Sequence, residues 1–160
     1  MKISTRGEYG IRAMLYIAMH GEERPVTSHE IAHHQAIPEP YLRQILALLS
    51  KDRLIQSNRG PQGGHTLGRP AESITLRDVL LTLEGHTTSI DQILSLPCAI
   101  DIGTEYCAIR EVLLEVREAV EQILTRVTLG QLVERQRTIL TQKINVPFFP
   151  SNPCLPVVRD

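Results

Sequence analysis

Residues 37–67, IPEPYLRQILALLSKDRLIQSNRGPQGGHTL, carry the pattern that decides the fold. Leucine and isoleucine recur every three or four residues in the first half, which predicts a helix over about 38–51 with one apolar face. Two short extended segments follow at 54–58 and 65–67, and the glycine- and proline-rich loop between them predicts a β-hairpin. A helix that leads directly into such a hairpin is typical of a winged helix-turn-helix.

The residues around this stretch complete the predicted domain. Apolar residues at helical spacing predict three more helices, over residues 5–20, 28–35 and 75–84. The small Ala32 allows the second helix to cross closely over the third, Ile37 is expected to fill the turn between them, and Pro38 to open the third helix. The expected fold class is therefore mainly α with a small β-hairpin wing, and residues 1–84 are predicted to form a winged helix-turn-helix DNA-binding domain.

A long helix without glycine or proline is predicted over residues 108–127, and it would be about 30 Å long at a rise of 1.5 Å per residue. Its apolar stripe is too wide for one small neighbour, so we expect a second copy of the chain to cover it. The alternative is that the stripe packs only on the chain's own N-terminal half. Residues 108–140 are assigned to dimerisation helices. The expected interface residues are Ile109, Val112, Val116, Val120 and Ile123.

The composition argues against several classes of protein. The chain is 42% hydrophobic and 22% charged, which is typical of a folded globular protein. No apolar run approaches the roughly 18 residues needed to span a bilayer. The start, MKISTRGEYG, lacks the apolar stretch of a signal peptide, so we expect a cytoplasmic protein with no membrane partner. No Ser/His/Asp set and no phosphate-binding loop is recognisable, which argues against an enzyme.

The net charge of −1 is unevenly distributed along the chain. Residues 1–69 hold nine Lys and Arg against six Asp and Glu, whereas residues 70–160 hold eight against twelve. A basic half beside an acidic half indicates that the first half meets phosphate groups. The alternative is a chance asymmetry of ordinary surface charge.

Three segments together resemble a known family over about residues 1–135. They are MKISTRGEYGIRAMLYIA, IPEPYLRQILALLSKDRLIQSNRGPQGGHTLGRP and CAIREVLLEV with the later VTLGQLVE. They look like the Rrf2 family of bacterial winged helix-turn-helix transcription regulators, whose members respond to iron–sulfur clusters, nitric oxide or cysteine metabolism. The resemblance implies a homodimer that binds an operator in double-stranded DNA, and we expect a repressor. The alternative is an interaction module regulated by a metabolic enzyme or metabolite.

The resemblance also implies which residues contact DNA. Arg43 would lie in the major groove, and Arg59 in the minor groove, where negative potential attracts a guanidinium. For Tyr41, half-buried packing and a base contact are both open, and Pro40 replaces a hydroxyl donor of some members. The full expected set is Ser28, Tyr41, Arg43, Gln44, Ser57, Arg59 and Gly60.

Two cysteines, Cys98 and Cys107, lie in a predicted sensor loop over residues 85–107. Cluster-binding members of the family have three cysteines there, and Arg110 stands where one subgroup has a histidine. These two departures count against a cluster, but some members use two cysteines and a residue of the partner's first helix, so the resemblance still implies an iron–sulfur site of Cys98 and Cys107 with Glu8 of the partner subunit as a third ligand. A metal-free thiol switch and a purely structural role are the alternatives.

The C-terminal segment, residues 141–160, has proline at every third position from Pro147, the repeat of polyproline II. We expect this tail to dock on its own dimer. Burial there is the expected role of Cys154.

Overall fold

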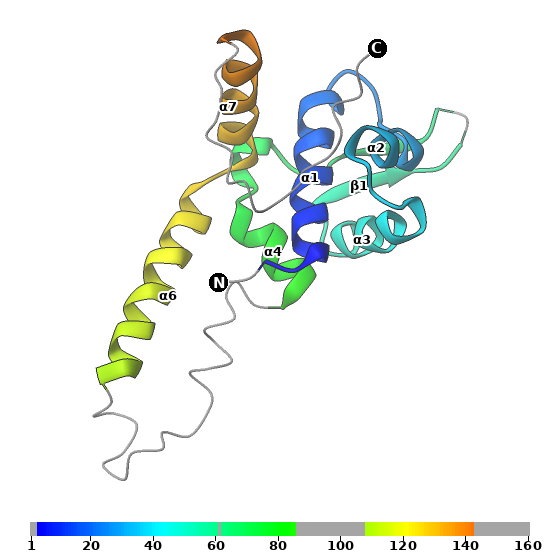
Figure 1. Ribbon diagram of the computed structural model, residues 1–160. Helices are drawn as coiled ribbons and strands as arrows, with labels where there is room; N and C mark the ends of the chain where they lie inside the picture. Colours follow the sequence, from blue (N-terminus) through cyan, green and yellow to red (C-terminus); the bar gives the residue numbers. More distant parts are fainter. Residues whose placement is uncertain (1–2, 61, 86–107, 143–160) are drawn as a thin grey trace.

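The computed structural model describes residues 3–60, 62–85 and 108–142 (Figure 1). Its elements are α1 (Thr5–His20), α2 (Ser28–Gln35), α3 (Glu39–Lys51), β1 (Ile55–Asn58), β2 (Gly64–Leu67), the short 3-10 helix η1 (Ala71–Ser73), α4 (Leu76–Glu84), α6 (Ala108–Arg126) and α7 (Leu129–Gln142). The predicted fold class, mainly helical with a two-stranded hairpin, is confirmed. Cys98, Cys107 and the proline-rich tail lie outside the described residues.

The helix boundaries follow from capping residues in the sequence. The Thr27 hydroxyl accepts a hydrogen bond from the Glu30 N–H at 3.1 Å and so begins α2. Ala36 takes the left-handed conformation, with φ of 48°, and ends that helix. Pro38 is the N-cap of α3 rather than its first residue, and Pro40 stands in the first turn, where a missing N–H costs nothing.

The core forms around α1, which packs against α2, α3, α4 and α7. Gly10 lies so close to Leu83 of α4 that a Cβ atom at this position would collide with the leucine side chain, and its absence lets the two helices approach. From α3, the side chains of Leu42, Ile45 and Leu49 are fully buried in the same core. The opposite face of α3 is therefore turned away from the protein.

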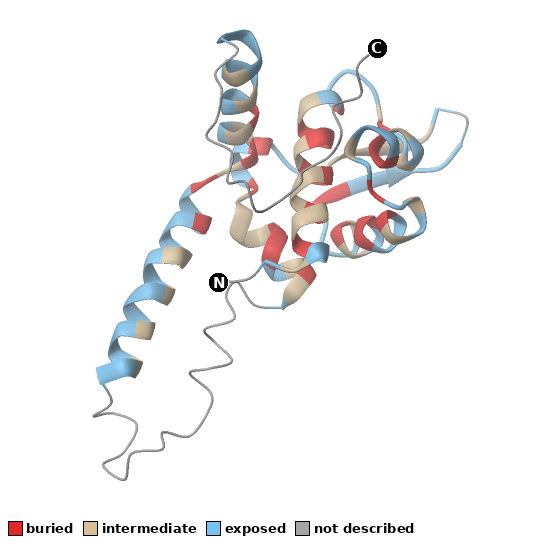
Figure 2. Cartoon of the chain, viewed as in Figure 1, coloured by how far each residue is buried: buried red, intermediate tan, exposed pale blue. Residues whose placement is uncertain are grey.

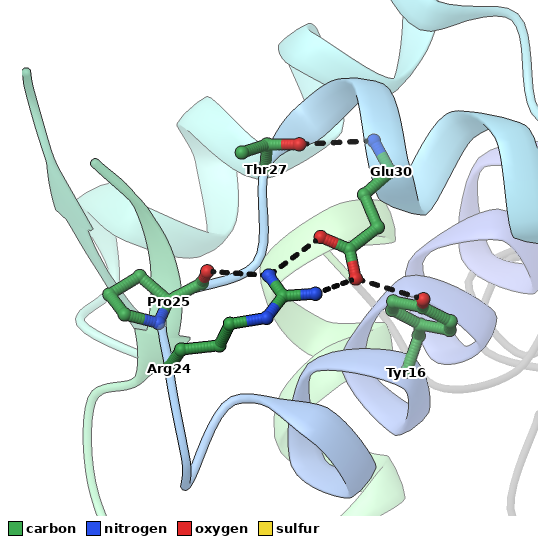
Figure 3. A network of polar contacts seen from close by, with 5 residues as sticks. All are labelled: Tyr16, Arg24, Pro25, Thr27 and Glu30. Carbon is green, nitrogen blue, oxygen red and sulfur yellow. Dashed lines mark hydrogen bonds and ion pairs between the residues drawn. The ribbon is translucent and has the colours of Figure 1, made fainter. Parts of the chain in front are cut away.

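A polar network fixes the direction in which α2 leaves α1 (Figure 3). The Arg24 guanidinium donates to both oxygens of the Glu30 carboxylate, at 3.0 and 2.8 Å. The Tyr16 hydroxyl of α1 donates to the same carboxylate at 3.2 Å. The hydrogen bond from Arg24 holds the pKa of Glu30 below its ordinary value, so the carboxylate stays ionised. The network therefore ties the end of α1 to the first turn of α2.

The second half of the chain is arranged differently, because α6 extends away from the domain formed by the N-terminal helices (Figure 1). An ion pair between Arg77 of α4 and Glu121 of α6, at 2.8 Å, and the buried side chain of Leu124 hold its C-terminal part to the domain. Then α7 returns to pack on α1 and η1. Most of α6 is exposed (Figure 2). Within the described ranges, no helix has the length and apolar character needed to cross a membrane.

Candidate nucleic-acid interface

The outward face of α3 is free of large apolar side chains, because Leu42, Ile45, Leu46 and Leu49 are buried on the opposite face of the helix. The exposed residues of this face are Pro40, Arg43, Gln44, Ala47 and Lys51. The face therefore carries two cations, Arg43 and Lys51, and the amide of Gln44 around the small side chain of Ala47. The sequence prediction included Arg43 and Gln44 but not Ala47 or Lys51.

Arg43 is held in place before any partner binds. Its side chain is 69% exposed, and its Nη2 donates to Oε1 of Glu39 at 2.6 Å, one helical turn earlier. Glu39 also lies 3.2 Å from Nδ1 of His29 on α2. The hydrogen bond from Arg43, and then that from His29, lowers the pKa of Glu39, so its carboxylate is ionised near neutral pH. A guanidinium has several N–H donors, so the contact with Glu39 leaves others for a base edge.

Tyr41 packs against the core rather than standing free on α3. It is half-buried, and its ring lies edge-on to that of Tyr9, with centroids 6.0 Å apart. This is the packing alternative that the sequence analysis left open for the ring. A contact between its hydroxyl group and DNA stays a prediction.

The wing carries Arg59 at its exposed tip. The strands β1 and β2 pair antiparallel, with Ser57 opposite His65 and Asn58 opposite Gly64. Gly60 has φ of +119°, which favours glycine, and its carbonyl accepts from the Gly63 N–H at 2.9 Å. The structure thus gives Gly60 a role in shaping the turn beside Arg59.

Ser28 and Ser57, both predicted as DNA contacts, are brought together by a residue that the sequence analysis did not select. The Ser28 hydroxyl lies 2.9 Å from Nε2 of His65, and the Ser57 hydroxyl 2.9 Å from Nδ1 of the same ring. Ser28 is the first residue of α2, where unpaired backbone N–H groups favour anions. Only the register of the hairpin, which places Ser57 opposite His65, would have revealed this arrangement.

Of the predicted sensor residues, Glu8 is the one within the described part of the chain. Its side chain is 45% exposed in the first turn of α1, with an oxygen 3.6 Å from Nη1 of Arg12. The carboxylate is therefore paired within its own helix and still partly open to solvent. No cluster of three or more His, Cys, Asp or Glu side chains occurs among the residues described, and the cluster site, whose two cysteines lie outside them, stays a prediction.

The predicted dimer residues form an apolar stripe on α6, and this helix is exposed over most of its length (Figure 2). The exposed fractions are 69% for Ile109, 56% for Val112, 44% for Val116 and 51% for Ile123. Val120, on the same side, is half-buried. The chain's own N-terminal half leaves these side chains exposed, contrary to the alternative in which it alone covers the stripe.

Comparisons with known proteins place this arrangement in a family. A model of the Rrf2 family, described as iron-dependent transcriptional regulators, matches residues 3–135. Protein rrf2 of Nitratidesulfovibrio vulgaris is 35% identical over 133 residues, which cover 83% of this chain and 87% of that protein. The transcriptional regulator IscR of Erwinia tasmaniensis is 31% identical over 140 residues, covering 88% and 83%.

The structural comparison agrees with the sequence comparison. The structure of CymR, the global cysteine regulator of Bacillus subtilis, has a TM-score of 0.72 at 32% identity, covering 84% of this chain and 98% of that one. The relatives are transcription regulators and not enzymes. The chain belongs to the Rrf2 family of winged helix-turn-helix, DNA-binding transcription regulators.

Proposed function

We propose that the protein represses transcription by binding an operator in double-stranded DNA as a homodimer, in the cytoplasm. The observation that carries the proposal is the outward face of α3, where Arg43, Gln44 and Lys51 are exposed while the opposite face is buried in the core. A major groove is wide enough to admit such a helix. Arg43 and Gln44 are then the side chains placed to read base edges.

The other contacts follow from the position of α3. The exposed Arg59 at the tip of the wing is suited to a minor groove beside the major groove that holds α3. The first turn of α2 directs backbone N–H groups and the Ser28 hydroxyl to the phosphate backbone. Base contacts then determine the sequence bound, and phosphate contacts determine the register.

The uncovered stripe on α6 supports the homodimer. Isologous contact between two such stripes removes apolar side chains of both copies from water. The dimer would present two α3 helices to two half-sites, which in helix-turn-helix dimers lie about 34–36 Å apart. A change in how α6 packs would change that separation and hence the affinity for the operator.

Arg59→Ala tests the proposed interface. The probe is a short duplex selected by the wild-type protein from a pool of random sequences, called here the selected duplex. Loss of one good contact is expected to weaken binding by about 1–3 kcal/mol, or about 5- to 150-fold at fixed salt. The matched control is Arg137→Ala on α7, which removes the same charge from an exposed position and is expected to leave the affinity unchanged. Equal affinities for all three proteins would refute the placement of the wing.

We further propose that the regulatory signal enters through Cys98 and Cys107. Support comes from the family match and from the partly exposed Glu8, whose carboxylate would join the two thiolates in holding an iron–sulfur cluster. When bound, such a cluster supplies a group that responds to oxidants and to iron supply. A metal-free thiol pair with the same position is the competing form of this proposal.

The colour of the protein decides between the two forms. Protein reconstituted with iron and sulfide without oxygen is expected to absorb visible light, and Cys107→Ala to abolish the absorption. Cys154→Ala is the matched control and should keep it, whereas Glu8→Ala should lose it faster in air. A colourless protein whose duplex affinity changes with oxidant in a Cys98-dependent way would establish the thiol pair. A colourless protein indifferent to oxidant would contradict both.

A further inference from the structure

His65 connects two parts of the candidate interface, the wing and the start of α2. Its backbone N–H donates to the Val26 carbonyl at 2.8 Å, and its carbonyl accepts from the Val26 N–H at 3.0 Å. Its ring adds the contacts with Ser28 and Ser57. One residue therefore connects the wing to the start of α2 through both backbone and side chain.

The two hydroxyl groups cannot be equivalent while the ring is neutral. A neutral imidazole has one N–H and one bare nitrogen, so one serine hydroxyl accepts from the ring and the other donates to it. The accepting hydroxyl keeps its own proton for a further partner, whereas the donating hydroxyl has none left. The Ser57 hydroxyl also lies 3.5 Å from that of Ser50, which extends the chain of hydroxyls to the end of α3.

We propose that His65 is a positioning residue of the DNA interface, whose imidazole holds the Ser28 and Ser57 hydroxyls at one spacing and determines which of them donates to a phosphate. The inference rests on the proposed function, since it concerns the phosphate contact of Ser28 and the predicted DNA contact of Ser57. A protonated ring has two N–H donors, so both serines would then accept from it and both would offer protons to DNA.

The surroundings of His65 set the direction of the effect of pH. Burial lowers the pKa of His65 below its ordinary value, so the ring is neutral in the free protein near pH 7. Phosphates near the ring favour its charged form, so binding of DNA takes up a proton and the affinity rises as the pH falls. The ionisable side chains on the elements around the hairpin are Arg6, Glu8, Tyr9, Arg12, Tyr16 and His20 of α1, His29, Glu30, His33 and His34 of α2, Glu39, Tyr41, Arg43 and Lys51 of α3, and Arg59 of the wing.

The first test compares uncharged replacements of His65 on the selected duplex. His65→Phe keeps a ring and the backbone bonds to Val26 but removes both side-chain bonds, and it should weaken binding by about 3- to 10-fold, the scale of one or two net hydrogen bonds. His65→Asn and His65→Gln each supply an amide near one ring nitrogen and should fall between. Because His65 acts through Ser28, Ser28→Ala should weaken the wild type more than it weakens His65→Phe.

The second test measures how the affinity for the selected duplex depends on pH, which a merely structural residue would not change. Between pH 8 and pH 6, wild-type affinity should rise by about 2- to 5-fold more than that of His65→Phe, because a pKa increase of one unit on binding gives its full tenfold effect only below the pKa of the free protein. His33→Gln, on an exposed histidine of α2, is the matched control and should keep the wild-type profile. NMR of the wild-type ring nitrogens should show His65 gaining a proton with the duplex.

The outcomes separate the two proposals. The role of His65 is overturned if wild type and His65→Phe have parallel pH profiles, or if the effects of Ser28→Ala and His65→Phe are additive. The proposed interface still stands in that case, provided that Arg59→Ala weakens binding. If Arg59→Ala has no effect either, the proposed interface itself fails. If His65→Phe does not fold, His65→Gln and the NMR titration of the wild type decide the question.

Discussion

Replacing Val116 and Ile123 of α6 with aspartate together is expected to separate the dimer into folded monomers. Both side chains are exposed in the single chain, so their loss costs the monomer little, whereas a dimer would have to bury the new carboxylates without partners. Each uncompensated charge costs several kcal/mol, and the two-fold interface contains every substitution twice. The dissociation constant of the dimer should therefore rise by at least about 1,000-fold, or about 4 kcal/mol. Sedimentation measures this change directly.

The matched control places the same charges outside the stripe. Gln122→Asp with Thr125→Asp adds two carboxylates at exposed positions of the same helix, and the dimer should persist. The affinity for the selected duplex should fall steeply in the first variant and not in the control, because a monomer occupies a single half-site. A dimer that survives Val116→Asp with Ile123→Asp would show that another surface joins the copies.

The fold was readable from the sequence because its signals are local. Helices α1 and α4 follow from apolar residues at helical spacing, and the structure ends α1 at Gly21 and begins α4 with a capping box of Thr75 and Asp78. The hairpin follows from two short extended segments and the glycine-rich loop between them. Pro38 shows the limit of such signals, since proline suits both the N-cap and the first turn, and packing decides between them.

The candidate site was readable only in part, because its geometry depends on contacts between distant residues. Arg43 and Arg59 were selected from the family pattern, and the structure places both on exposed surfaces. The i,i+4 spacing of Glu39 and Arg43 on a predicted helix would have revealed their ion pair, whereas His65, which joins two serines, has no signal of its own in the sequence. Its partners depend on the register of the hairpin, which the hydrophobic pattern, the turn type and the loop length determine together.

Ala47→Glu is expected to abolish binding of the selected duplex while leaving the fold intact. Ala47 lies at the centre of the outward face of α3, four residues from both Arg43 and Lys51. A glutamate there gains helix pairs with the two cations worth about 0.3–0.5 kcal/mol each, so thermal stability should stay the same or rise slightly. In the complex, the same carboxylate would neutralise both cations and face the negative charge of DNA, which costs several kcal/mol and hence at least about 100-fold in affinity.

Ala47→Gln separates the charge of this substitution from its size. Glutamine has nearly the shape of glutamate, so it should weaken binding by less than about tenfold, the effect of crowding a close contact without repulsion. Gln142→Glu, the same gain of charge at the exposed end of α7, should not change the affinity at all. A stable Ala47→Glu protein that binds the duplex as tightly as the wild type would exclude the outward face of α3 from the DNA interface. Loss of binding in both Ala47 variants would instead show that the size of the side chain matters more than its charge. In that case only a small residue at position 47 lets α3 enter the DNA groove.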